Sequence, residues 1–182
     1  MMRGAALAVL IGTALLAEPV RAEVIDLFPS ECDASPALED LVGPYRLSVF
    51  PGMLTDGVRS VAASHHSSHA VSLILMGEDL VLQDASGGPA VSFRYVGPDE
   101  PGWHGDDGEV STEELAEIAG CDVNRLPRLI GSGTTMADGG QVSFTYRLMI
   151  WNMTPEHAAL IGGMEWSGGG VTVTRRVMME AQ

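Results

Sequence analysis

The stretch Val142-Ser143-Phe144-Thr145-Tyr146-Arg147-Leu148-Met149-Ile150 decides the fold. Apolar or aromatic side chains occupy every second position, and side chains such as Ser143 and Thr145 lie between them. Because successive side chains of a β-strand point to opposite faces of its sheet, a period of two predicts a strand with one buried and one wetted face. The stretch therefore indicates an antiparallel sheet with an assignable core face.

Shorter runs with the same alternation recur along the chain, at 45–49, 71–76, 80–82, 91–95, 160–166 and 171–177. Glycine-rich turn sequences such as Gly77-Glu78-Asp79 separate them, as in hairpins. The adjacent Arg175 and Arg176 shift the alternation in the last run and predict a β-bulge there. Seven or eight antiparallel strands are expected.

Short strands at near-regular spacing are typical of an up-and-down barrel or a two-sheet sandwich, so the predicted fold class is mainly β. One short helix is expected near 112–119. Ser111 and Glu114 form a capping box before it, and Gly120 is a natural stop after it.

The tripeptide Gly43-Pro44-Tyr45, at the start of the first predicted strand, is similar to the G-x-W that opens lipocalin barrels. This likeness implies a lipocalin-like general architecture. It covers three residues, Tyr45 stands where that family has Trp, and the lipocalin helix comes late in the chain rather than centrally. The resemblance therefore does not assign the chain to the family.

The N-terminus carries the features of an export signal. Residues 1–22 combine a positive start at Arg3, an apolar run from Gly4 to Ala17 and a cleavage sequence at Val20-Arg21-Ala22. The apolar run is shorter than the roughly twenty residues that a transmembrane helix needs. We expect a cleavable signal peptide, a single β-rich domain over 23–182, no membrane span after cleavage, and a periplasmic or secreted location.

Two cysteines, Cys32 and Cys121, remain after that cleavage. In an oxidising compartment an even number of cysteines is most simply interpreted as a disulfide, so we predict a structural Cys32–Cys121 bond. Two free buried thiols, a redox role and a metal role remain alternatives, although neither a C-x-x-C pair nor a ligand cluster accompanies either cysteine.

Charge excludes one class of partner. The 182 residues include 24 acidic and 10 basic side chains, for a net charge of -14, and no basic patch interrupts this excess. The negative electrostatic potential that this excess of acidic residues produces repels phosphate backbones, so nucleic acid is not an expected partner. Five of the ten arginines, Arg46, Arg94, Arg147, Arg175 and Arg176, fall in the predicted strands, which leaves an anionic small ligand compatible with the net charge.

The only histidine cluster is His65, His66 and His69, whose spacing would allow three imidazoles to reach one zinc or copper ion if the segment turned. The alternative is a solvated Ser/His loop between strands. A second candidate site is a surface formed by Trp103, Met149 and Trp151, because exposed aromatic side chains often mark binding surfaces.

No nucleophile elbow or catalytic-metal motif is present, which favours a protein that is not an enzyme. The predicted function is an exported, soluble, non-catalytic binding module for a small apolar ligand or an envelope protein partner, with no resident cofactor. The alternative is a periplasmic metal-binding protein that uses the three clustered histidines. An enzyme of unfamiliar kind remains open.

Overall fold

The computed structural model describes residues 35–97, 122, 125–137, 140–154 and 157–182. Several sequence predictions concern residues outside this set. They are the signal peptide at 1–22, the Cys32–Cys121 disulfide, the helix near 112–119 and the surface residue Trp103.

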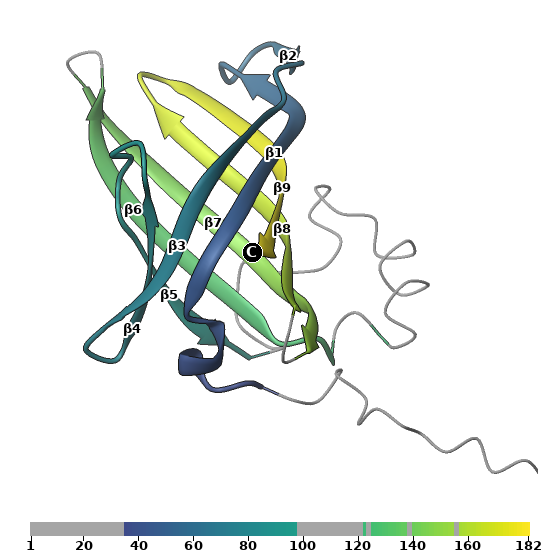
Figure 1. The fold of residues 1–182 in the computed structure, drawn as a ribbon. Coiled ribbons are helices and arrows are strands. Elements are labelled where there is room, and N and C mark those ends of the chain that lie inside the picture. Colours follow the sequence, from purple (N-terminus) through teal and green to yellow (C-terminus); the bar gives the residue numbers. More distant parts are fainter. Residues whose placement is uncertain (1–34, 98–121, 123–124, 138–139, 155–156) are drawn as a thin grey trace, which may run out of the picture.

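Eight antiparallel strands close into a barrel, and a ninth short strand is added at one end (Figure 1). The pairing order is β2-β1-β3-β4-β5-β6-β7-β8-β9, and β1 also pairs with β9. This last pairing makes the structure a barrel rather than a two-sheet sandwich, so the mainly β, antiparallel barrel prediction is confirmed. The strands are β1 (Gly43–Thr55), β2 (Ser60–Ala63), β3 (Ser67–Met76), β4 (Asp79–Asp84), β5 (Val91–Val96), β6 (Arg128–Ala137), β7 (Gly140–Thr154), β8 (His157–Gly168) and β9 (Val171–Ala181).

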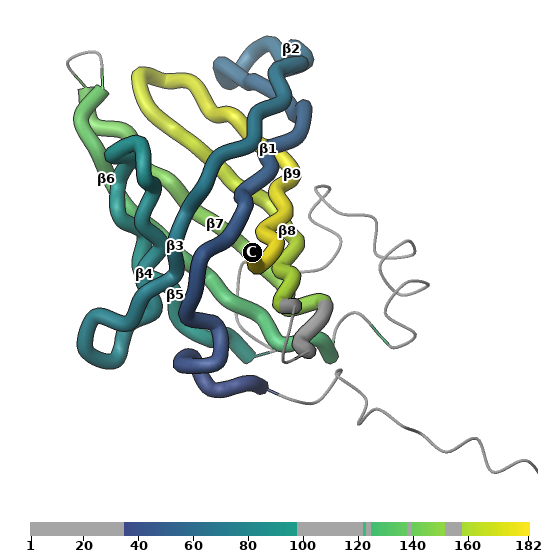
Figure 2. The backbone as a smooth tube through the Cα atoms, in the orientation of Figure 1, coloured from purple at the N-terminus to yellow at the C-terminus, as the bar shows by residue number. Residues whose placement is uncertain are grey.

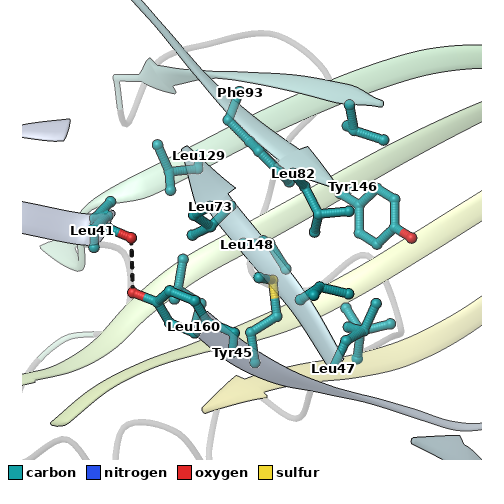
Figure 3. Close-up of a cluster of buried hydrophobic side chains, with 14 of the residues drawn as sticks. Leu41, Tyr45, Leu47, Leu73, Leu82, Phe93, Leu129, Tyr146, Leu148 and Leu160 are labelled. Carbon is teal, nitrogen blue, oxygen red and sulfur yellow. Dashed lines mark hydrogen bonds between the residues drawn. The ribbon is translucent and has the colours of Figure 1, made fainter. Parts of the chain in front are cut away.

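Alternation places the apolar side chains inside the barrel. Phe93, Leu129 and Leu148 are almost completely buried, and Phe93 meets Tyr146 edge to face with ring centroids 6.0 Å apart (Figure 3). The intervening positions, such as Ser92 and Arg94 on β5, are exposed on the outside. The core cluster also contains Leu41, Tyr45, Leu47, Val49, Val71, Leu73, Leu80, Leu82, Val91, Ile150, Ala158, Leu160, Val177 and Met179.

A short 3-10 helix, η2 (Leu38–Leu41), covers one end of this core, which we call the base. Leu41 is fully buried, and its carbonyl oxygen accepts a 3.0 Å hydrogen bond from the Tyr45 hydroxyl (Figure 3). A second tyrosine, Tyr95, donates a 2.6 Å hydrogen bond to the Pro36 carbonyl. Burial raises the pKa of both hydroxyls to about 12, so both remain protonated donors at neutral pH.

Two strands were not expected from the sequence. β6 has glycine at two consecutive inward positions, Gly131 and Gly133, so apolar side chains do not occupy every second position along it. An added Cβ at Gly131 would lie 2.5 Å from the Phe93 ring, which occupies that space. β2 has only four residues, of which three are exposed, and it pairs with the last residues of β1. Neither strand shows the alternation on which the prediction depended.

The β-bulge predicted at Arg175 and Arg176 is instead located in the partner strand. β9 keeps an unbroken register with β8, whereas the β1–β9 register shifts between Val49 and Gly52. The extra residue in β1 places Gly52 directly opposite Arg175. Arg175 therefore shares the inward face of β9 with Val177, and Arg176 points outward. Figure 2 shows β1 and β9 running side by side along the length of the barrel.

Gly52 permits the close pairing at this bulge. A Cβ on Gly52 would lie 1.9 Å from the Thr174 carbonyl oxygen and 2.9 Å from the Cγ atom of Arg175. Backbone atoms of a paired strand cannot move aside as the tip of a flexible side chain can. The closing pairing of the barrel thus requires glycine here.

Gly52→Ala should therefore destabilise the protein, and Gly43→Ala is its matched control in the same strand. A Cβ at Gly43 would meet nothing within 4 Å. We expect urea unfolding to give a free energy of unfolding about 2–3 kcal/mol lower for Gly52→Ala, because the clash separates β1 from β9. Equal stability of the two variants would contradict the proposed close contact.

Candidate functional site

At the end of the barrel opposite η2, residues of several strands line a cavity of about 610 Å³, which we call the mouth cavity. The β6–β7 and β8–β9 hairpins and the end of β1 form its wall. Its volume lies within the range of small-ligand pockets in proteins, roughly 300–1,000 Å³. The side chains of its wall are mainly apolar, and include Leu54, Val142, Met164, Trp166, Val171 and Val173.

Residue size along the strands explains why the mouth is open and the base is filled. Near the base, the inward positions of β7 carry Tyr146, Leu148 and Ile150, which pack in the core. At the mouth, β7 and β9 carry smaller side chains, Val142 and Val173. Trp166 lies opposite Val173 in the register of β8 with β9. The cavity is thus bounded by one large aromatic side chain and several short aliphatic ones.

Arg175 is the cationic side chain in the wall of this cavity. It is half-buried, and its Nη1 donates a hydrogen bond to the backbone carbonyl of His65, between β2 and β3. Within the described ranges, no carboxylate lies within 4.0 Å of its guanidinium. The mouth therefore combines an apolar wall with one positive charge.

One acidic side chain, Asp84, lies on the inward face at the opposite side of the barrel, where it pairs with Val71. Its Oδ1 accepts hydrogen bonds from the Ser86 backbone N–H (2.7 Å) and from the Ser86 hydroxyl (2.6 Å). Burial alone would raise the pKa of Asp84, but the two Ser86 hydrogen bonds and the charge of His69 outweigh it and lower that pKa. Asp84 is thus engaged in holding the β4–β5 turn.

Tyr146 lies near Asp84 at the boundary between the mouth and the filled core. Burial, with a smaller contribution from the Asp84 carboxylate, raises the pKa of Tyr146 to about 12. The phenol is therefore neutral under physiological conditions and unsuited to act as a general base.

The structure does not gather the three clustered histidines. The His66 ring packs against Phe50 at a tilt of 45°, with ring centroids 5.4 Å apart, and the backbone carbonyl of His65 accepts a hydrogen bond from Arg175. His69 lies opposite Leu47 on the inward face of β3. In the described part of the chain, no group of three His, Cys, Asp or Glu side chains could hold a metal ion.

The predicted surface of Trp103, Met149 and Trp151 is only partly described. Met149 points away from the core but is 1% exposed, so it offers no accessible surface, contrary to the expectation from strand alternation. Its neighbour Arg128, opposite it on β6, is also buried. Trp151 is half-buried at a register shift in β7 and lines an outer groove of about 530 Å³ with Phe50, Ile161, Met178 and both adjacent arginines of β9, Arg175 and Arg176.

Sequence reasoning missed Arg175, Trp166 and Met164 as residues of one site. A signal for Arg175 was present: unbroken alternation from Val173 to Met179 places it on the same face as the core residues Val177 and Met179. The adjacent Arg176 concealed this pattern.

Among the described residues, no helix is long and apolar enough to cross a membrane.

Because the side chains of His65, His66 and His69 do not converge, we expect that they do not bind a zinc ion together. Replacing His65, His66 and His69 together by alanine should leave the zinc affinity unchanged within error, because these side chains do not share one ion. Isothermal titration of both proteins with zinc checks this. A micromolar affinity that disappears in the triple variant would restore the metal-binding alternative.

Comparisons with known proteins do not assign the chain to a family. No protein-family model matches the chain, and no curated protein is significantly similar to it in sequence.

Proposed function

We propose that this protein is a non-catalytic binding module that holds a small apolar ligand in its mouth cavity. The observation that carries the proposal is the cavity itself: about 610 Å³ at one end of a barrel whose other end is packed and covered by η2. A closed barrel provides a rigid wall, so a ligand would enter a preformed site and lose little affinity to protein reorganisation.

The chemistry of the wall favours an apolar ligand. Burying each methylene group contributes about 0.8 kcal/mol, and an aromatic side chain such as Trp166 offers a large flat contact surface. Ligand binding would also remove Trp166, Met164 and Val173 from water. Affinity in the micromolar range is the expectation for a ligand with a medium-length alkyl chain.

The described polar groups support binding rather than catalysis. Asp84 is held by Ser86, and among the described residues no serine or threonine hydroxyl bonds to an imidazole. A nucleophile without an adjacent base is weak, so acyl transfer has no visible machinery here. The proposed location is the periplasm or the exterior, in line with the signal peptide expected at 1–22.

The outer groove supports a second candidate, an envelope protein partner. Trp151, Phe50 and Arg176 line this groove, and Trp, Phe and Arg are residue types enriched at protein interfaces. Photo-crosslinking in the native host from position Trp151 would capture such a partner. Crosslinks absent at Trp151 but present at the exposed base residue Val42 would argue against the groove.

Ligand binding at the mouth can be tested with the neutral fluorescent probe N-phenyl-1-naphthylamine. We expect its emission to rise on binding with a micromolar Kd. Val173→Trp should weaken this binding at least about tenfold, because the indole fills the cavity. Val42→Trp, at the exposed base, is the control and should keep the original Kd. Absence of probe binding by the wild-type protein, or equal affinity of the two variants, would contradict the proposal.

A further inference from the structure

We infer that the ligand of the mouth cavity is an amphiphile with an anionic head group, which Arg175 binds while the apolar wall holds its alkyl chain. The inference rests on the proposed function and specifies its ligand class. The head group would be a carboxylate or a phosphate, the two anions whose geometry matches a planar guanidinium.

Arg175 differs from the other arginines on the strands in the direction of its side chain. Of the arginines on the strands, Arg46, Arg94, Arg128, Arg147 and Arg176 lie at outward register positions. Arg175 pairs with Gly52 and Met164, on the same face as the core residue Val177. A lone inward guanidinium among apolar side chains costs desolvation free energy unless an anion or several acceptors compensate.

Two features fix the position of this side chain. Gly52 leaves room for its stem, since a Cβ there would lie 2.9 Å from Arg175 Cγ. At the other end, the His65 carbonyl accepts a hydrogen bond from Nη1. A guanidinium has further N–H donors besides that one, so this contact orients the group without saturating it. A preorganised donor loses less entropy when it binds an anion.

The charges close to Arg175 are compatible with a bound anion. Among the described residues, no carboxylate forms an ion pair with Arg175. Asp84, the acid on the inward face, is already hydrogen-bonded to Ser86. The protein as a whole has a net charge of -14, which would repel an anion at long range. Attraction must therefore be local, and it should weaken only moderately with salt because Arg175 is half-buried.

The test compares three ligands that share one chain: decan-1-ol, decanoate and decyl phosphate. Each displaces N-phenyl-1-naphthylamine from the wild-type protein at pH 7.5. We expect at least one anionic ligand to bind about tenfold more tightly than decan-1-ol, since charge-assisted hydrogen bonds are stronger than neutral ones. The tighter of the two anions identifies the head group.

Arg175→Gln should remove this preference, so that the anionic ligands bind no more tightly than decan-1-ol. Arg46→Gln is the matched control, because it makes the same change in net charge on the exposed outer face of β1. It should keep the preference. Circular dichroism melting of each variant verifies that the barrel is folded.

The two proposals fail in different ways. If wild-type protein binds neither probe nor any decyl ligand, the proposed function is wrong. If the probe and decan-1-ol bind but neither anion binds more tightly, or if the preference persists in Arg175→Gln, the mouth is an apolar site and the anionic head group is wrong.

Discussion

The pairing of β1 with β9 is the constraint on which the rest of the structure depends. It joins the two ends of the described sheet and thereby removes its principal open edges. Gly52 makes this pairing possible at the bulge, where any Cβ would meet the Thr174 carbonyl. The same bulge sets Arg175 opposite Gly52, while the unbroken alternation of β9 directs its side chain inward. The β1–β9 pairing therefore both closes the barrel and places a glycine opposite the charged residue at its mouth.

Closure also divides the interior into two parts with different roles. At the base, Tyr45, Leu148 and Leu160 fill the barrel, and η2 covers it. Burial of the apolar side chains in this packed part stabilises the fold. The mouth adds little to the core and remains available for a ligand. The division explains how a small barrel can remain stable while it leaves an apolar cavity open.

The alternation of apolar and polar residues predicted those strands whose two faces differ in polarity, and it predicted which face is buried. Along β7 the inward positions from Val142 to Ile150 lie as the alternation indicated. The alternation did not reveal β6, because inward glycines interrupt its apolar positions. The inward direction of Arg175 was present in the alternation of β9, but the adjacent Arg176 concealed it. Barrel closure likewise depends on pairing between distant segments, and that information is absent from any single run of residues. The histidine spacing indicated proximity in sequence, but His65 and His66 lie in the connection between β2 and β3 whereas His69 lies on the inward face of β3, so the three side chains do not form one site.

Methyl NMR of the protein during titration with neutral decan-1-ol tests the central claim, an apolar binding site confined to the mouth. The account predicts concentration-dependent shifts of the Met164 and Val173 methyl resonances, which belong to residues of the mouth cavity. The Met179 and Leu148 methyls in the packed base should remain unchanged. Shifts confined to Ile161 and Met178, in the outer groove, or no shifts at all, would contradict it.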